Sequence, residues 1–341
     1  MKNRRRLFLT AVACCLAGQL GFARAGDMRL IGSGASFPAP LYSAWFKDFS
    51  RKTDGVTVDY QAKGSGAGIQ DLINKTVDFA ASDAAMTPEQ MSKVPDGVVL
   101  LPMTAGEIVL AYNLPSVKGL KLPRDVYPDI FAGKITKWDD SRIVAANSDV
   151  KLPSLPITVV RRSDSSGTTF VFTKHLSAIS PVFKEQIGMG TTVNWPQSDK
   201  FVAAPKNDGV TATIKQTPGA IGYIEYGYAK LTKSDTALLQ NRAGNYVAAS
   251  DASGAVALAS AQLPADMIAW IDDPSAPESY PIVSFTWMLF YQKQDPDKAK
   301  YLRELVRYGL TEGQKSADKM GYIPLPSTVV EKVMAASAKI Q

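Results

Sequence analysis

Strand-like and helix-like segments alternate along most of the chain, and this alternation constrains the fold more than any other feature. Short apolar runs typical of strands occur at residues 56–60, 77–81, 107–112, 157–160 and 220–223. Other apolar residues recur at helical spacing, as at Ile69 and Leu72 and, towards the C-terminus, at Leu302 and Val306. The alternation predicts an α/β architecture whose sheets are mostly parallel.

The length of the chain, 341 residues, exceeds that of one typical domain. The sequence contains no low-complexity run, heptad pattern or repeat of fixed period. Two apolar stretches, 108–112 and 282–291, are candidates for chain crossings between domains. If both cross, residues 26–110 and 282–341 form a discontinuous first α/β domain, and residues 111–281 form an inserted second α/β domain.

The start of the chain has the pattern of a secretory signal peptide over residues 1–25. Basic residues from Lys2 onward precede a short apolar run at 7–16, and alanines occupy the positions that signal peptidase reads. An uncleaved membrane anchor is the alternative, but a spanning helix needs about 20 predominantly apolar residues, and Gln19 interrupts the run. We therefore expect cleavage after Ala25 and export of the mature protein.

Two features of this leader bear on its export route and its processing. Residues 5–9 resemble a twin-arginine export signal, but three consecutive arginines also suit an ordinary secretory leader, which we favour. Cys14 and Cys15 could carry a lipid anchor, but the leucine usual three residues before such a cysteine is missing in both cases. Because these are the only cysteines, we expect no disulfide and no thiol chemistry in the mature chain.

Removing the leader changes the charge balance. The chain has 38 basic and 32 acidic residues, a formal net charge of +6. Five of the basic residues and none of the acidic ones lie in residues 1–25, so 33 basic residues remain against 32 acidic ones. The basic character therefore belongs to the export signal and does not indicate nucleic-acid binding.

Two segments place glycines and small hydroxyl residues where a strand should meet a helix. In residues 32–38, the loop would present backbone N–H groups and the Ser36 hydroxyl at a helix start, which is an anion site in outline. An ordinary helix cap is the alternative. Residues 64–68 are glycine-rich and let the backbone approach a ligand closely. They form neither a nucleophile elbow nor a P-loop, and a plain turn is the alternative.

A third segment, residues 161–169, is the most informative. An arginine offers a bidentate fork for an oxyanion, and Asp164, two residues after Arg162, could hold that fork in place. The following helix start adds two hydroxyls and an unobstructed glycine N–H, from Ser166, Thr168 and Gly167. A capped helix preceded by a surface ion pair is the alternative.

A fourth segment places Asp83 just after the strand-like run at 77–81, where ligands of α/β sheets tend to bind. A carboxylate at this position would repel an anion unless the anion carries a proton to donate. A turn-forming aspartate is the alternative.

The residue types argue against an enzyme. His175, the only histidine, lies in a predicted helix with no nucleophile elbow, so we expect a half-exposed helix residue and not a catalytic base. Without mature cysteines, and with one histidine, a zinc site is not expected. We expect no catalytic residue, no metal and no cofactor.

Five blocks, in this order, resemble the periplasmic phosphate-binding receptors of ABC-type phosphate uptake systems: residues 34–40, 77–83, 133–140, 161–172 and 218–226. The resemblance covers nearly the whole mature chain. It implies the periplasmic binding protein fold of type II, in which two α/β domains joined by a hinge hold the ligand in the cleft between them. It also implies that the protein binds inorganic phosphate in the periplasm and delivers it to inner-membrane ABC permease subunits. Nothing suggests an oligomer, so we expect a monomer with no nucleic-acid partner.

By position, the resemblance implies nine phosphate-site residues: Ser36, Phe37 through its amide, Ser65, Asp83, Arg162, Asp164, Ser166, Gly167 and Thr168. The blocks around Trp138 and at 221–226 are interpreted as core and strand pieces of the inserted domain. Three departures from the family pattern keep every required donor. Serine replaces the commoner threonine at Ser36, Gly66-Ala67 replaces Ser-Gly, and Ser165 replaces a glycine.

Asp83 is expected to select the ligand. Phosphate at neutral pH keeps at least one O–H, which can donate to the Asp83 carboxylate, whereas sulfate has no proton and would set acceptor against acceptor. A receptor for sulfate or molybdate is therefore disfavoured, whereas arsenate, which keeps a proton, remains an alternative ligand. Two different functions also compete with that of a receptor: a secreted phosphatase that uses one of the serines, and an adhesive surface protein built on the same scaffold.

Overall fold

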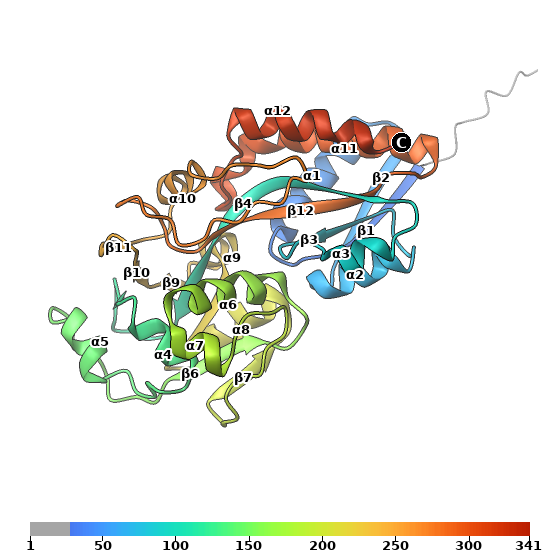
Figure 1. The fold of residues 1–341 in the computed structure, drawn as a ribbon. Coiled ribbons are helices and arrows are strands. Elements are labelled where there is room, and N and C mark those ends of the chain that lie inside the picture. Colours follow the sequence, from blue (N-terminus) through green and yellow to red (C-terminus); the bar gives the residue numbers. More distant parts are fainter. Residues whose placement is uncertain (1–27) are drawn as a thin grey trace, which may run out of the picture.

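The computed structural model describes residues 28–341. The predictions made for the leader, including cleavage after Ala25 and the two cysteines, lie outside the described residues. Figure 1 shows two α/β parts, one built mainly from both ends of the chain and the other from its middle. Over residues 28–341, no helix combines the length and apolar character that crossing a membrane requires.

The first part, which we call lobe 1, is built on a mixed sheet. Its strands lie in the order β2 (Val56–Ala62), β1 (Met28–Gly34), β3 (Phe79–Ser82), β12 (Val283–Tyr291) and β4 (Val98–Tyr112). β1 pairs in parallel with β2 and β3, whereas β12 is antiparallel to both β3 and β4. The sheet is therefore less parallel than the alternation of segments predicted, because a strand from late in the sequence enters its middle.

The second part, lobe 2, continues the sheet from the far end of β4. Its further strands are β8 (Ala220–Glu225), β6 (Thr158–Arg162) and β7 (Phe201–Ala204), with β9 (Asp235–Thr236) also paired to β4. β6 is parallel to both neighbours, and β8 is antiparallel to β4. A small separate sheet contains β11 (Tyr246–Val247), β10 (Leu238–Gln240) and β5 (Lys121–Leu122).

Strand β4 belongs to both lobes. It pairs with β12 up to Glu107 and with β8 from Ile108 onward, so its partner changes between two consecutive residues. All of its residues after Val98 are buried. A long apolar strand buried on both faces is what the continuous run of hydrophobic residues favours.

Helix α1 (Ala39–Lys52) shows how the local sequence builds these elements. Prolines near its start suit a first helical turn, where a backbone N–H is not needed. Apolar residues recur every three or four positions and form one buried face: Leu41, Tyr42, Trp45, Phe46 and Phe49. Packing of this face against the sheet of lobe 1 fixes the loop between β1 and α1 at the carboxyl end of β1.

The remaining helices cover the two sheets (Figure 1). Lobe 1 carries α2 (Ser65–Ile73), α3 (Pro88–Ser92), α11 (Pro296–Leu310) and α12 (Ser327–Ala336), with α10 (Asp251–Leu258) near the junction of the lobes. Lobe 2 carries α4 (Val126–Phe131), α5 (Ser141–Ala146), α6 (Gly167–Ile179), α7 (Pro181–Gln186), α8 (Lys206–Gln216) and α9 (Tyr226–Thr232). The strands and helices predicted from apolar patterns all form, with β4 starting earlier than residue 107.

The block around Trp138 is structural, as predicted. The Trp138 side chain is fully buried, and its indole N–H donates to the carbonyl of Gly219 over 2.9 Å. Residues 221–225 form most of β8, and all of them are buried. Both blocks therefore support the core of lobe 2.

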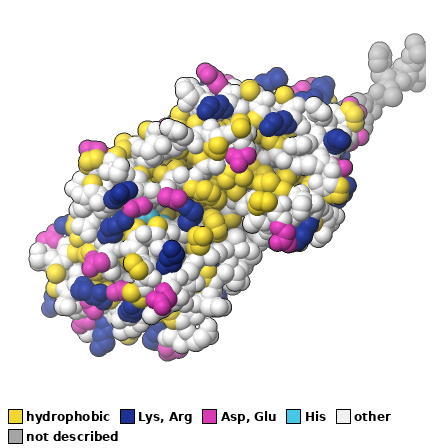
Figure 2. Space-filling model, viewed as in Figure 1, with side chains coloured by type: hydrophobic (Ala, Val, Ile, Leu, Met, Phe, Trp, Pro, Cys, Tyr) yellow, Lys and Arg dark blue, Asp and Glu magenta, His cyan; other side chains and the backbone are white. Residues whose placement is uncertain are grey.

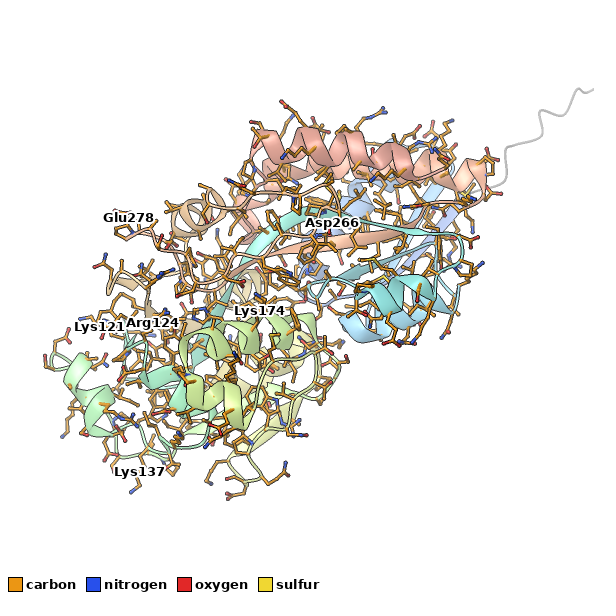
Figure 3. All side chains as sticks on the ribbon, viewed as in Figure 1. Lys121, Arg124, Lys137, Lys174, Asp266 and Glu278 are labelled. Atoms are coloured by element: carbon orange, nitrogen blue, oxygen red, sulfur yellow. The ribbon has the colours of Figure 1, made fainter. Side chains whose placement is uncertain are left out.

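A loop of residues 259–282 returns the chain from lobe 2 to lobe 1. Within it, Trp270 packs against Phe170 of α6, with ring centroids 5.2 Å apart, and against Trp287 of β12, at 5.3 Å. Lys174 of α6 forms an ion pair with Asp272 of the loop, and Figure 3 places Lys174 on the edge of α6 nearest lobe 1. Figure 2 shows hydrophobic side chains gathered in the middle of this face, where the lobes meet.

Candidate functional site

The loop between β1 and α1 is held by three tyrosines. The carbonyl groups of residues 35–37 accept hydrogen bonds, in order, from the hydroxyls of Tyr60 (2.7 Å), Tyr228 (2.6 Å) and Tyr322 (2.8 Å). Within the described chain, the amide of Phe37 makes no hydrogen bond. The three tyrosines hold the loop in place, and the Phe37 amide, which has no partner among residues 28–341, can donate to an anion at the helix start.

The Ser36 hydroxyl lies beneath the same loop and is almost fully buried. Its Oγ accepts hydrogen bonds from the backbone N–H of Asn207, at 3.1 Å, and from the Asn207 side-chain amide, at 3.0 Å. Asn207 lies at the start of α8 in lobe 2. Ser36 of lobe 1 is therefore bonded directly to lobe 2.

The start of α2 and the end of β3 bring Ser65 and Asp83 together. The Ser65 Oγ accepts a hydrogen bond from the Asp83 backbone N–H, at 3.2 Å. Thr286 of β12 donates to Asp83 Oδ1 over 2.7 Å. Both Ser65 and Asp83 are buried, and the second Asp83 oxygen, Oδ2, points towards the start of α6.

The environment of Asp83 favours its protonated form. Burial raises the pKa of Asp83 to about 7, although the hydrogen bond from Thr286, the charge of Arg162 and the Ser65 hydroxyl all act to lower it. Desolvation penalises the ionised carboxyl more than these partners stabilise it. Asp83 therefore changes charge near neutral pH and not in the acidic range of an ordinary carboxyl.

Arg162, at the end of β6, is held by Asp164 as predicted. Its Nε donates to Asp164 Oδ1 over 2.8 Å, and its Nη2 donates to Asp164 Oδ2. Nη1 donates to the Thr168 hydroxyl over 3.3 Å. A guanidinium has five N–H donors, so one hydrogen on each terminal nitrogen is left for a ligand. Partial burial acts to raise the pKa of Asp164, but the bonds and charge of Arg162 lower it overall.

Helix α6 begins at the site with its N-terminal amides exposed to it. Ser166 caps the helix, and its Oγ accepts from the backbone N–H of Thr169 over 3.0 Å. Within residues 28–341, the amides of Gly167 and Thr168 make no hydrogen bond. Free amides and the positive end of the helix dipole together favour an anion here.

Gly167 of lobe 2 lies in close contact with lobe 1. A Cβ at this position would lie 2.4 Å from Ser65 Oγ and 2.7 Å from Asp83 Oδ2, which no side chain tolerates. Only glycine allows α6 of lobe 2 to approach lobe 1 so closely.

All nine predicted residues lie around one small region between the lobes. Eight of them are buried, and Asp164 is part-exposed.

The arrangement can bind a small anion rich in hydrogen-bond acceptors. Donors converge from the starts of α1, α2 and α6 and from Arg162, whereas Asp83 offers the one carboxylate that faces them. Asp164 is already occupied by Arg162 and by the backbone N–H of Lys206. No group of three or more His, Cys, Asp and Glu side chains within 28–341 is placed to hold a metal ion.

Sequence reasoning missed two polar residues of this site. Asn207 bonds both Ser36 and Thr168, and Thr286 bonds Asp83. The only local signal for Asn207 is its place at a helix start, and Thr286 lies inside an apolar strand with no signal at all.

The expectation for His175 was wrong. The side chain is 6% exposed and not half-exposed, and its Nε2 lies 2.9 Å from the Tyr127 hydroxyl. Burial lowers the pKa of His175 to about 3, so the ring is neutral. The face of α6 that carries His175 packs against lobe 2 and against the loop at 259–282, so more of this helix is covered than one apolar stripe indicated.

Comparison with known proteins agrees with this geometry. Residues 23–312 match the family model described as the PBP superfamily domain. The chain is 38% identical to the phosphate-binding protein PstS of Haemophilus influenzae over 321 residues, 93% of this chain and 94% of that one. It is 37% identical to the phosphate-binding protein PstS of Pasteurella multocida over 311 residues, 90% of this chain and 89% of that one.

Among solved structures, the chain resembles a high-affinity periplasmic phosphate-binding protein, PfluDING, determined with bound phosphate. The TM-score is 0.75 at 22% identity, covering 90% of this chain and 93% of the other. This likeness concerns the fold. It confirms the predicted architecture of two α/β lobes joined by a hinge with a cleft between them.

Proposed function

The chain belongs to the PBP superfamily and, within it, to the family of the PstS phosphate-binding proteins, and on this premise we propose that it binds inorganic phosphate between its lobes for import by an ABC permease. Its relatives are named as binding proteins and not as enzymes. The protein is accordingly a receptor and not an enzyme.

One observation carries the proposal: converging donors face a single buried carboxyl. A phosphate dianion has acceptors for the amides of Phe37 and Gly167, for the hydroxyls and for Arg162, and it has one O–H for Asp83. Three helix starts stabilise its charge without a formal excess of cations, because Asp164 neutralises Arg162.

Enclosure between the lobes strengthens each of these hydrogen bonds, because water is excluded from the site. The nine proposed phosphate-site residues are Ser36, Phe37, Ser65, Asp83, Arg162, Asp164, Ser166, Gly167 and Thr168. Asp164 acts on phosphate through Arg162, since the Asp164 oxygens already bond that side chain and the amide of Lys206.

The proposed domain division follows the sheets. Residues 26–110 and 282–341 would move as one body and residues 111–281 as the other, with phosphate released when they separate. The partner change of β4 after Glu107 and the start of β12 at Val283 support these boundaries. Hinge closure of this kind is a common response of two-domain proteins to ligands.

The cellular setting is part of the proposal. The protein would be exported by its leader, cleaved after Ala25, and act in the periplasm as a monomer that delivers phosphate to inner-membrane permease subunits. Arsenate is the alternative ligand, because it also keeps a proton for Asp83. A phosphatase is disfavoured, because the buried serines lack a histidine base: His175 bonds Tyr127 in lobe 2.

Isothermal titration of the phosphate-stripped protein, from Gly26 onward, tests the proposal. Tight one-to-one binding of phosphate, with no heat from sulfate at about pH 8, is the expected result. Equal binding of both anions would leave a receptor but remove the role of Asp83. Absence of phosphate binding, or turnover of a chromogenic phosphate ester, would overturn the proposed function.

A further inference from the structure

Asn207 connects two hydroxyls of the site, one from each lobe. The side chain is fully buried. Its Nδ2 donates to Ser36 Oγ over 3.0 Å and to Thr168 Oγ1 over 3.1 Å, so both of its hydrogens are used. The backbone N–H of the same residue also donates to Ser36 Oγ, at 3.1 Å.

These bonds fill the acceptor positions of both hydroxyls. A hydroxyl has one hydrogen to donate and two lone pairs to accept. Ser36 Oγ accepts twice from Asn207, and Thr168 Oγ1 accepts from Asn207 and from Arg162 Nη1. Each hydroxyl therefore has only its own hydrogen left, and it can contact a ligand only as a donor.

The Asn207 amide cannot turn around to accept instead. Its Oδ1 accepts a hydrogen bond from the backbone N–H of Glu225, at 3.0 Å. If the amide were reversed, its NH2 group would face the Glu225 N–H. Two donor groups would then face each other in a buried place, and the Glu225 N–H would have no acceptor. The start of α8 is also fixed, because the N–H of Lys206 donates to Asp164 Oδ1 over 2.9 Å.

The other two hydroxyls of the site are not constrained in this way. Ser65 Oγ accepts from one backbone N–H, that of Asp83, and Ser166 Oγ accepts from one, that of Thr169. Each keeps a lone pair free and could accept from a protonated ligand.

We propose that Asn207 is a positioning residue that fixes Ser36 and Thr168 as hydrogen-bond donors towards the ligand. The inference rests on the proposed function, because it concerns how two hydroxyls of the phosphate site are oriented. It predicts that the contribution of Asn207 to binding acts through these two hydroxyls and disappears when they are absent.

A double-mutant cycle tests this dependence. Asn207→Leu removes both side-chain donors at similar volume, and phosphate affinity is measured by titration in the parent and in the Ser36→Ala, Thr168→Val background. We expect Asn207→Leu to weaken phosphate binding about 30-fold in the parent and less than about threefold in the second background. If Asn207→Leu does not fold, Asn207→Ala serves in the same cycle.

Asn147→Ala is the matched control. Asn147 is also a buried asparagine that bonds backbone groups, those of Lys121 and Ile143, but it lies away from the site. The Asn147→Ala variant should have a lower melting temperature than the parent and an unchanged Kd for phosphate. A similar loss of affinity from the Asn207 variant in both backgrounds, or none in the parent, would overturn the proposal. Failure of the parent itself to bind phosphate would instead remove the proposed function, and this inference with it.

Discussion

The backbone N–H of Gly66 donates a hydrogen bond to the carbonyl of Ser165 over 3.1 Å, joining the start of α2 in lobe 1 to the residue before the cap of α6 in lobe 2. A Cβ at Gly66 would lie 2.1 Å from Ser165 Oγ. The serine side chain thus fills the space that a side chain at residue 66 would need. If the family pattern expected from the resemblance holds, with serine at 66 and glycine at 165, the two departures should compensate for each other in space.

This compensation can be tested by reversing the two departures. Gly66→Ser alone should weaken phosphate binding by about tenfold or more, because overpacking costs typically 1–3 kcal/mol and opposes approach of the lobes. Ser165→Gly alone should have little effect, and the double variant should recover the parent affinity. Titration of the four proteins checks this. Parent-like binding by Gly66→Ser would show that the contact is not needed in the bound form.

Replacing Asp83 should reduce discrimination between phosphate and sulfate. Asp83→Asn offers an N–H donor to sulfate, where the carboxylate offers only acceptors, and an unpaired buried acceptor costs about 1–3 kcal/mol or more. We expect the ratio of phosphate to sulfate affinity to fall at least about tenfold. Asp78→Asn, which removes an acid from the same segment outside the site, should leave the ratio unchanged. Undiminished rejection of sulfate by Asp83→Asn would place the filter elsewhere.

Sulfate binding should depend on pH through Asp83. Because burial raises the pKa of Asp83 to about 7, the carboxyl is protonated below that pH and ionised above it. A protonated carboxyl can donate to sulfate, so sulfate should bind more tightly at about pH 5 than at about pH 8. Direct titrations of the phosphate-stripped protein with sulfate at both pH values measure this, because sulfate does not itself gain a proton in this range. In Asp83→Asn, the Kd for sulfate should be nearly independent of pH; a slope that persists there would assign the effect to another group.

Removing the guanidinium should weaken binding more than folding. Arg162→Ala loses two ligand-facing donors, each a hydrogen bond to a charged group contributing about 1.5–3 kcal/mol, so affinity should fall about 100-fold or more. Asp164 keeps the N–H of Lys206 and some solvent exposure, which limits the cost to the ligand-free protein. Arg161→Ala, on the neighbouring residue, should bind phosphate as the parent does. A ligand-free melting temperature far below that of the parent would make Arg162 mainly structural.

Trp270 should report closure of the lobes. Its ring contacts Phe170 of lobe 2 and Trp287 of lobe 1 in the arrangement described here, so separation of the lobes would change its surroundings. We expect phosphate to change the intrinsic fluorescence and Trp270→Phe to remove most of that change, with the Kd altered less than about threefold. Trp138→Phe, within the core of lobe 2, should retain the signal. A full response in Trp270→Phe would place the reporter elsewhere.

Much of the fold could be predicted because it is encoded locally, as apolar runs and helical spacing that indicate strands and helices. Local sequence indicated an anion site only in outline, around Arg162 and the helix starts. The full set of nine candidate residues, including Phe37 and Ser65, came from the family resemblance. The pairing of β12 between β3 and β4 could not be predicted from local sequence. No local pattern states which strands will be neighbours when they lie far apart in the sequence.

The missed residues of the site share the same cause. Asn207 and Thr286 are single polar residues, distant in sequence from Ser36 and Asp83, and their importance comes only from the contacts that the fold creates. The error at His175 is of the opposite kind. A histidine in a predicted helix was expected to be half-exposed, but the loop at 259–282 and Tyr127 cover its side chain.

The shared strand has a consequence for protein engineering. Because β4 changes partner between Glu107 and Ile108, a cut at this first crossing between the lobes falls inside a hydrogen-bonded strand and leaves both fragments with an open, aggregation-prone sheet edge. Neither lobe is thus a module that can be expressed or exchanged alone. A fluorescent reporter or an artificial terminus belongs at an exposed turn such as 242–245, where the strand joining the lobes remains intact.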